Sequence, residues 1–180
     1  REGSIWIGSA GAGLARWLGY PDWDTWTDAE GLPSESVWGL ERDRQGVLWG
    51  GGDNGVSRFI ESRRAWEELK LPGLPASLTT RVVEAPDGTL WLAQPTGPVA
   101  IDPQRKLARA YGKESGLTTP WASALVVDAE NRVWTGTPNG LFLGERKNGR
   151  YVFTRQNLHL ERGLDFHYAS LIDGQGRLWV

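Results

Sequence analysis

The sequence predicts an all-β fold made of repeated four-stranded units, and three observations carry this prediction. Five tryptophans stand 43, 42, 43 and 45 residues apart, each in the same local frame. A glycine or an asparagine, which tolerates a positive φ angle, lies three positions before each of them and indicates a turn. No segment repeats apolar residues at the i, i+3, i+4 and i+7 spacing of an amphipathic helix. The periodic tryptophans are Trp6, Trp49, Trp91, Trp134 and Trp179.

Each repeat predicts four short strands in a fixed order. One strand contains the periodic tryptophan, and a glycine six or seven residues later introduces the next strand. After a third turn and a further strand, a Gly-Leu pair leads into an apolar segment that ends near an aspartate or alanine. The glycines that introduce strands are Gly13, Gly55, Gly97 and Gly140, and the Gly-Leu pairs begin at Gly31, Gly73, Gly116 and Gly163. The segments that follow these pairs end near Asp43, Ala85, Asp128 and Asp173.

Four strands in about 43 residues, separated by turns, are typical of one blade of a β-propeller. We expect a partial propeller over residues 1–180, with about seventeen strands in about four blades. The repeat units are 1–42, 43–85, 86–128 and 129–173, and residues 174–180 begin another unit. Because the strand of Trp179 duplicates the strand of Trp6 instead of completing a blade, we expect an arc of a larger ring, with seven blades.

Composition narrows the function classes. The chain has 180 residues, 39% of them hydrophobic and 23% charged, with a formal net charge of -2, so no basic surface favours nucleic acid or an anionic membrane. The absence of cysteine excludes thiol catalysis and disulfides. No apolar run approaches the ~20 residues that span a bilayer. The absence of methionine, together with Arg1 leading directly into a strand-like segment, indicates an excerpt of a longer chain.

The segment "EGLPSESVWGLERDRQGVLWGGGDNGVSRF" resembles the two-component regulator propeller repeat. The matching positions are Gly31, Leu32, Pro33, Ser34, Val37, Leu40, Asp43, Gly46, Leu48, Trp49, Gly51, Gly55 and Val56. The fourth unit, "DAENRVWTGTPNGLFL", fits with Asn131 in place of glycine. Two departures stand elsewhere: Ala85 replaces the expected aspartate, and Ala93 and Gln94 replace a Gly-Thr pair.

This resemblance implies the periplasmic or extracellular sensor of a bacterial membrane receptor. Blades of this family often form tandem rings, followed by an immunoglobulin-like domain, a transmembrane helix and a histidine kinase or diguanylate cyclase, and many members sense carbohydrates. The implied partners are a small-molecule or oligosaccharide ligand and the adjoining propeller, immunoglobulin-like and signalling domains of the same parent chain, with a homodimer as a further expectation. The membrane is reached only through a helix of the parent protein, and no nucleic acid or cofactor is expected.

The strand order of a propeller assigns the candidate site. The loops that enter the strand before each aspartate, and the turns after the tryptophan strand, share one rim, which we call the upper rim; the aspartate turns share the lower rim. The upper rim surrounds the central channel and is the default ligand face, and aromatic rings beside amides and carboxylates suit a sugar. The candidate ligand-binding residues are Glu35, Ser36, Trp38, Asp53, Asn54, Gln94, Thr118, Thr119, Trp121, Asn139, Asp165 and His167.

Individual positions carry different expectations. The periodic tryptophans are expected to pack in the core, whereas Trp38 and Trp121 depart from the repeat frame and do not align with each other. Asp43, Asp128 and Asp173 are expected to cap their turns by accepting backbone N–H bonds. Those three turn positions serve structure in this interpretation, and the two departing tryptophans are the stronger ligand candidates.

No nucleophile, base and orienting group are spaced for catalysis, so no catalytic residue is predicted. The two histidines, His159 and His167, are too few for a transition-metal site, and no metal is expected. The favoured function is therefore a non-enzymatic sensor module. One alternative is an enzyme of the streptogramin-lyase type, a propeller with similar units, in which His167 would act as the base. The other alternative is a protein-interaction propeller that binds no small ligand.

Overall fold

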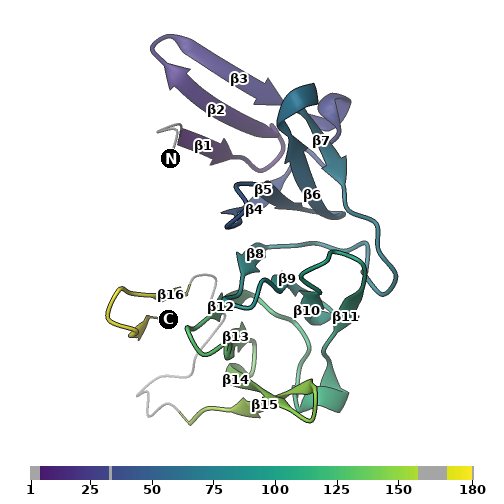
Figure 1. Cartoon of the computed structure of the whole chain (residues 1–180), viewed down its shortest axis with the longest axis vertical. Helices are drawn as coiled ribbons and strands as arrows, with labels where there is room; N and C mark the ends of the chain where they lie inside the picture. Colours follow the sequence, from purple (N-terminus) through teal and green to yellow (C-terminus); the bar gives the residue numbers. More distant parts are fainter. Residues whose placement is uncertain (1–4, 33, 158–169, 180) are drawn as a thin grey trace.

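The computed structural model describes residues 5–32, 34–157 and 170–179, and this part of the chain forms seventeen strands in five antiparallel sheets (Figure 1). The first sheet contains β1 (Ile5–Gly8), β2 (Leu14–Gly19) and β3 (Asp22–Trp26). The second contains β4 (Val37–Arg42), β5 (Leu48–Gly52), β6 (Gly55–Ile60) and β7 (Ala65–Glu68). The third contains β8 (Arg81–Glu84), β9 (Leu90–Gln94), β10 (Gly97–Ile101) and β11 (Ala108–Ala110).

The fourth sheet contains β12 (Ala124–Val127), β13 (Val133–Thr137), β14 (Gly140–Lys147) and β15 (Arg150–Arg155), and the fifth pairs β16 (Leu171–Ile172) with β17 (Leu178–Trp179). Three single-turn 3-10 helices lie in connecting segments: η1 (Asp28–Glu30), η2 (Glu61–Arg63) and η3 (Lys113–Ser115). No helix in the described ranges is long and apolar enough to cross a membrane.

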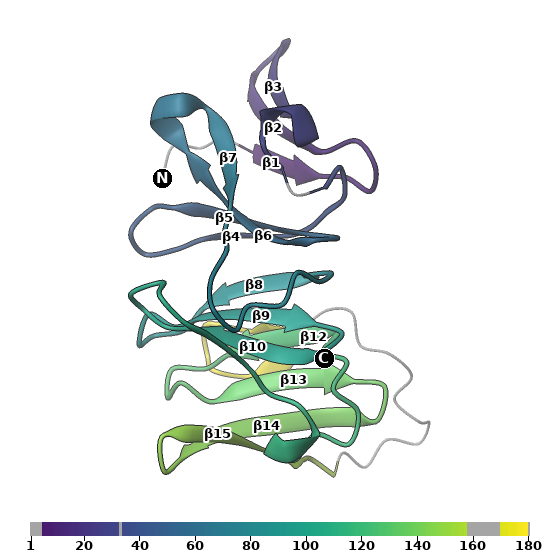
Figure 2. The same cartoon turned by 90° about the vertical axis from the view of Figure 1, so that its right-hand side faces the viewer.

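Strands follow one another in chain order within every sheet, so each four-stranded sheet is a meander, as in a propeller blade. The first strands of successive blades, β4, β8, β12 and β16, are neighbours in space, and they define the inner side of the arc. Figure 2 shows the sheets stacked one after another along the chain. The predicted fold class, all-β with four-stranded blades forming an arc, is confirmed.

The sheets divide the chain differently from the sequence units. A unit such as 43–85 comprises the last three strands of one blade and the first strand of the next. The three complete blades therefore run from β4 to β7, from β8 to β11 and from β12 to β15. We call them the second, third and fourth blades, and the sheet of β1, β2 and β3 is the first blade.

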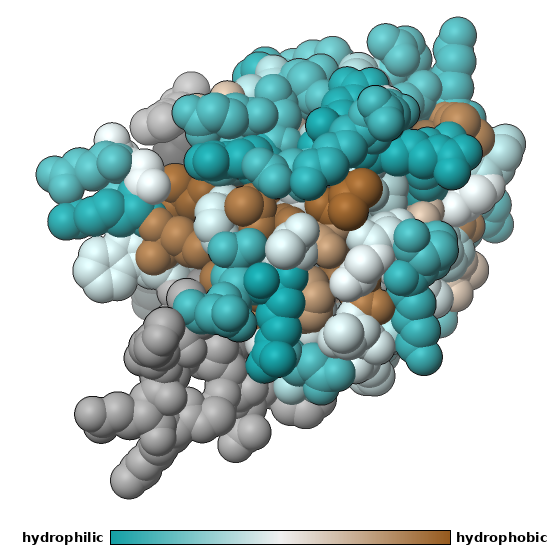
Figure 3. All heavy atoms as spheres, turned by 90° about the horizontal axis from the view of Figure 1, so that it is seen from below, coloured by the Kyte–Doolittle hydropathy of each residue, from teal (hydrophilic) through white to brown (hydrophobic). Residues whose placement is uncertain are grey.

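The periodic tryptophans lie on the second strand of each four-stranded blade and the equivalent strands β1 and β17. Trp49 and Trp91 are 2% and 0% exposed and belong to clusters that join neighbouring sheets. The expected core packing is wrong for Trp179, which is 56% exposed on the two-stranded fifth sheet. At the end of the molecule formed by the fourth blade, Figure 3 shows hydrophilic side chains around an apolar area.

The aspartate turns cap themselves as the sequence predicts. Asp43 Oδ1 accepts hydrogen bonds from the backbone N–H groups of Gln45 (3.0 Å) and Val47 (2.8 Å). The second carboxylate oxygen, Oδ2, accepts the indole N–H of Trp49 at 2.8 Å, a contact that the sequence pattern did not suggest. Because Asp128 and Asp173 make the same three kinds of contact, one carboxylate ties each turn to its tryptophan strand.

Neighbouring blades approach closely where their first strands meet. A Cβ atom added to Gly39 on β4 would lie 2.9 Å from the carbonyl oxygen of Thr80, just before β8. Only a glycine fits such a backbone approach without displacing its neighbour. This contact sets the spacing of the two blades at the upper rim, next to the candidate site.

Candidate ligand site on the upper rim

A cavity of about 320 Å³ opens where the chain enters the first strands of the second, third and fourth blades. It contains both of the tryptophans that depart from the repeat frame, although 83 residues separate them in sequence. Trp38 is 50% exposed and Trp121 is 40% exposed, so each indole presents a face to solvent. The cavity is lined by Trp38, Leu78, Thr80, Trp121 and Ser123.

Trp38 owes its position to an irregularity in β4. The register between β4 and β5 shifts between Val37 and Gly39, and both of these residues are buried. Trp38 is therefore the extra residue of a β-bulge, which leaves it exposed between two buried neighbours. The indole N–H of Trp38 donates to Asp53 Oδ1 at 2.7 Å, which fixes the orientation of the ring.

Asp53 is itself held in place by the loop that precedes β4. Its backbone N–H donates to Ser34 Oγ at 2.9 Å, and the Ser34 hydroxyl donates to the carbonyl of Ser36 at 2.9 Å. Trp38, Asp53 and Ser36, three of the candidates from the sequence, are thus linked on one side of the cavity. Glu35 is exposed on the same loop, and its carbonyl accepts the N–H groups of Gly11 and Gly13 from the first blade.

Trp121 lies on the opposite side, in the loop before β12. The next residue, Ala122, is fully buried, and its N–H donates to the carbonyl of Gln94 at 3.0 Å. Ser123 then joins the fourth blade through its N–H and its hydroxyl, both of which donate to the carbonyl of Gly136. The backbone on the C-terminal side of Trp121 is therefore attached to both the third and the fourth blades.

Thr118, Thr119 and Asn139 form a second cluster close to Trp121 in sequence. The Asn139 side-chain amide donates to Thr119 Oγ1 at 2.6 Å and to Thr118 Oγ1 at 3.3 Å. The second blade has an equivalent contact between Ser34 and Asp53. In both blades, a residue in the turn between the second and third strands bonds to the loop that precedes a first strand. The exposed amide and hydroxyl groups lie on the upper rim, beside the loop that carries Trp121.

The remaining candidates lie apart from the cavity or outside the described residues. Gln94 is fully buried, and its amide donates to Thr79 Oγ1 at 2.9 Å and to the carbonyl of Pro75 at 3.4 Å, so it supports the rim from below. Asn54 lies in an exposed turn and borders a different, smaller hollow. Asp165 and His167 fall within 158–169, outside the described residues.

The sequence interpretation did not select Leu78, Thr80 and Ser123. The lining residues occupy two positions of the repeat, counted back from the residue at the end of each first strand (Asp43, Ala85 or Asp128). Five positions earlier stand Trp38, Thr80 and Ser123, and seven positions earlier stand Leu78 and Trp121. Counting back from these residues would have found the lining, because both repeat positions lie where the chain enters the first strand, at the inner side of the arc. The cavity is therefore built from equivalent positions of three blades.

Charged groups lie further along the inner strands, below the cavity. Burial raises the pKa of Glu41 on β4, as do the nearby carboxylates of Glu84 and Asp43, while a backbone hydrogen bond from Glu84 and the charge of Arg81 oppose the rise. The described residues that line the cavity supply two indoles, one aliphatic side chain and two hydroxyl groups, and none of them is charged. It is suited to an uncharged ligand with both apolar and hydroxyl surfaces.

The arrangement contains no acid–base pair aimed at a common point. The lining side chains include no carboxylate, imidazole or amine, which are the usual acid–base groups. Among the described residues, no group of three or more His, Cys, Asp or Glu side chains is placed to hold a metal ion. Binding is the chemistry that these lining residues can provide.

Comparison with known families identifies the repeat. Residues 31–54, which contain the Gly-Leu loop, β4, the Asp43 turn and β5, match the model of the two component regulator propeller family. This segment is similar to the repeat of the two component regulator propeller family. Trp38, which lines the cavity, and its hydrogen-bond partner Asp53 both lie inside the matched segment. No curated protein matches the sequence.

Solved structures share the fold of this chain. The extracellular domain of the protein named hybrid two component system BT4673 from B. thetaiotaomicron is 18% identical with a TM-score of 0.80, and the match covers 99% of this chain and 25% of that one. The corresponding domain of BT3049 from the same organism is 19% identical with a TM-score of 0.61, covering 99% and 29%. The chain thus spans about a quarter of the length of the BT4673 chain.

A propeller enzyme is also similar. Virginiamycin B lyase from Staphylococcus aureus is 16% identical with a TM-score of 0.64, and the match covers 87% of this chain and 53% of the lyase. At these identities the similarities establish the propeller fold, because one propeller architecture hosts many activities.

Proposed function

We propose that the chain is part of the ligand-sensing propeller of a bacterial membrane-bound receptor, and that it binds its ligand in the cavity between Trp38 and Trp121. The single observation that carries this proposal is the meeting of these two exposed indoles from different blades in one cavity. The regulator propeller match, and the similarity to extracellular domains of proteins named two component systems, support a sensor rather than another use of the fold.

A carbohydrate is the ligand class that the cavity fits best. Indole faces stack on the C–H surfaces of a pyranose ring, and the hydroxyl oxygens of Thr80 and Ser123, whose protons go to backbone carbonyls, would accept hydrogen bonds from sugar hydroxyls. A volume of about 320 Å³ is at the lower end of the range for small-molecule sites, so one or two sugar rings would fill it.

Sensing would work through the packing of blades. The cavity is shared by three blades, and a ligand that contacts all of them favours the blade arrangement in which its contacts are best made. A ligand shifts such an equilibrium only by its different affinities for the two arrangements. The change would pass to adjoining propeller, immunoglobulin-like and signalling domains of a parent chain on the periplasmic or extracellular side of the membrane, with a homodimer as one possible assembly.

Lyase activity is the competing function, and the similarity to virginiamycin B lyase is the observation that favours it. The reaction would need a histidine base over the upper rim, and His167 is the residue that the sequence offers. Replacing His167 by alanine distinguishes the two functions: a sensor retains its ligand affinity and shows no turnover in either form, whereas an enzyme loses turnover.

The binding site is tested by titrating the full chain with a panel of neutral oligosaccharides in a calorimeter. We expect Trp38→Ala and Trp121→Ala each to weaken binding about tenfold, because a stacked aromatic ring contributes on the order of 1 kcal/mol beyond the area that it buries. Trp23→Ala is the matched control, since Trp23 is also 50% exposed but lies on β3, outside the cavity.

Two outcomes would contradict the proposal. One is that no oligosaccharide of the panel gives heat of binding. The other is that Trp23→Ala weakens binding as much as Trp38→Ala, which would show that the cavity is not where the ligand binds.

A further inference from the structure

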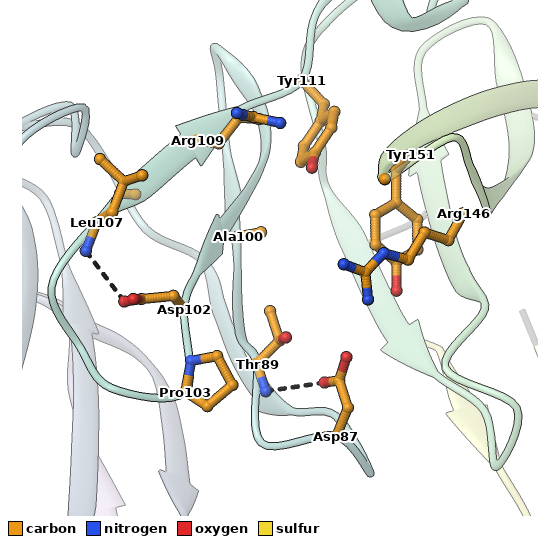
Figure 4. A pocket seen from close by; sticks show the side chains of 12 residues that line it. Asp87, Thr89, Ala100, Asp102, Pro103, Leu107, Arg109, Tyr111, Arg146 and Tyr151 are labelled. Atoms are coloured by element: carbon orange, nitrogen blue, oxygen red, sulfur yellow. Dashed lines mark hydrogen bonds between the residues drawn. The ribbon is translucent and has the colours of Figure 1, made fainter.

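A second cavity lies on the lower rim, between the third and fourth blades, and nothing in the proposed sensing site uses it. Its volume is about 430 Å³ (Figure 4). One wall comes from the β8–β9 turn and the hairpin of β10 and β11, and the other from the hairpin of β14 and β15. We call it the lower cleft. Its chemistry is set by Asp87, Asp102, Arg109, Tyr111, Arg146 and Tyr151.

The two arginines of the lower cleft have no partner within the described part of the chain. Arg109 on β11 and Arg146 on β14 form no hydrogen bond or ion pair with any described residue, and they come from opposite walls. Most other arginines of the described chain, such as Arg105 and Arg132, have a carboxylate within 4 Å. Two guanidinium groups thus face one cleft with no described carboxylate within 4 Å of either.

The acidic residues of the cleft are already engaged by backbone groups. Asp102 Oδ1 accepts the N–H groups of Lys106 (2.6 Å) and Leu107 (3.0 Å), and Figure 4 shows its carboxylate directed to Leu107. Asp87 Oδ1 accepts the N–H of Thr89 at 2.9 Å. Both carboxylates hold their own turns, and neither lies within 4 Å of the Arg109 or Arg146 guanidinium group.

Aromatic rings form the inner wall. The Tyr151 hydroxyl donates to the carbonyl of Asn131 at 2.8 Å, and burial, with the nearby Asp87 charge, raises the pKa of Tyr151 to about 12, so this phenol is neutral. The Tyr111 ring lies close by, and its hydroxyl points into the cleft (Figure 4). That hydroxyl forms no hydrogen bond with a described residue and is available as a donor.

The junction between the second and third blades has an ion cluster that the lower cleft does not have. Between the second and third blades, Arg105 lies over the Trp49 ring at 5.5 Å and within 4 Å of two carboxylates, those of Asp43 and Glu84. At the equivalent positions of the next junction stand Ala85 and Val127, and Tyr151 packs on Trp91 instead of an arginine, with ring centroids 4.8 Å apart. The junction of the third and fourth blades thus has the aromatic pair of Tyr151 and Trp91 where the preceding junction has an ion cluster around Arg105, and Arg109 and Arg146 line its cleft.

We propose that the lower cleft is a binding site for a small organic anion that carries a carboxylate or a similar oxyanion. Arg109, Arg146 and the Tyr111 hydroxyl would bind the oxyanion, since guanidinium groups pair with such groups through charge-assisted hydrogen bonds. The apolar body of the ligand would pack against Pro103 and Leu107 at the other side of the cleft. This inference is independent of the proposed sensing site, which uses other residues on the other rim.

The test uses benzoate against benzamide, which has nearly the same shape without the charge. The arginine Nε–Hε signals of the full chain are followed by nuclear magnetic resonance during titration at constant ionic strength. We expect benzoate to shift the signals of Arg109 and Arg146 with a saturating curve, and benzamide to leave them unchanged. Equal effects of the two compounds, or benzoate shifts spread evenly over all arginines, would overturn the proposal.

Variants separate a specific site from general attraction of anions. Arg109→Gln and Arg146→Gln should each weaken benzoate binding about tenfold. Arg155→Gln, on β15 of the same blade but outside the cleft, should leave it unchanged and removes the same charge. Arg146→Lys keeps the charge and loses the planar fork, so an intermediate affinity is expected. If Arg155→Gln weakens binding as much as Arg146→Gln, the site does not exist.

Discussion

At the scale of single residues, the environment of each periodic tryptophan depends on one neighbour in the turn. Trp49 and Trp134 donate their indole N–H to the aspartate six residues earlier. Trp91 has Ala85 at that position, and its buried Nε1 has no hydrogen-bond partner. A buried donor without a partner loses its hydration and gains nothing in return. Because Ala85 replaces the aspartate, the indole N–H of the fully buried Trp91 has no acceptor, which costs stability.

This difference predicts unequal costs for the same substitution. Trp49→Phe and Trp91→Phe remove the same atoms from two equally buried sites, but only Trp49→Phe leaves a carboxylate oxygen without its donor. We expect Trp49→Phe to lower the free energy of unfolding by about 1–2 kcal/mol more than Trp91→Phe. Denaturant unfolding of the two variants measures it, and equal losses would show that the indole hydrogen bond contributes nothing.

Sequence patterns predicted single residues well where the repeat determines them. The capping role of Asp43 follows from the Asp-x-x-Gly turn alone, and the core position of Trp49 follows from its period. The meeting of Trp38 and Trp121 could not be predicted, because it depends on how three blades pack, which no local spacing records. The sequence selected Trp38 and Trp121 because they depart from the repeat frame. It did not predict that they line one cavity, or that Thr80 lines it with them.

At the scale of elements, the aspartate turns make the blade hairpins sensitive to acid. Burial raises the pKa of Asp128, but hydrogen bonds from the Arg132 backbone, the Trp134 indole and the Arg132 guanidinium outweigh it and leave that pKa below its ordinary value. At Asp173, the indole of Trp179 and the backbone and side chain of Arg177 lower the pKa to about 2. Both turns therefore keep their charged caps well into the acidic range.

A lowered pKa fixes the sign of the pH dependence. The stabilisation by Asp128 is fully present above the unfolded pKa of about 3.9 and is lost as the pH falls through the lower folded value. We expect Asp128→Asn to destabilise the chain by about 2 kcal/mol at pH 7, with a difference from the wild type that shrinks below about pH 4. Urea unfolding between pH 7 and pH 3 checks this.

Glu130→Gln is the control for the Asp128 turn, because Glu130 is exposed and its ion pair with Arg132, at 3.4 Å, is open to solvent. It should change stability by less than about 0.5 kcal/mol at every pH. A constant difference between Asp128→Asn and the wild type across the pH range would contradict the proposed cause.

At the scale of the whole molecule, the junctions between blades differ although the blades repeat. The second and third blades are joined on the lower rim by Arg105, which reaches Asp43 across the junction and Glu84 within its own blade. Burial lowers the pKa of Arg105, and the two carboxylates oppose this. The third and fourth blades use Tyr151 and Trp91 instead. Sequence periodicity predicts the blades, but it does not predict which chemistry joins each pair.

Removing the bridging cation should loosen one junction. Arg105→Gln leaves two largely buried carboxylates without this partner, and we expect a loss of about 2 kcal/mol in the free energy of unfolding, together with faster amide exchange in β4 and β8. Arg58→Gln is the control, since the Arg58 and Glu67 pair is 45% and 43% exposed and should contribute little. Equal losses in the two variants would count against a special role for the junction.

Three blades line the upper-rim cavity together, and this limits how the site could be engineered. Its lining comes from the entrances to three successive inner strands, so no single blade contains a binding site that could be transplanted to another scaffold. A bulkier residue in place of Gly39, beside the cavity, would have to displace the backbone at Thr80, and would therefore change the shape of the cavity without altering a lining side chain.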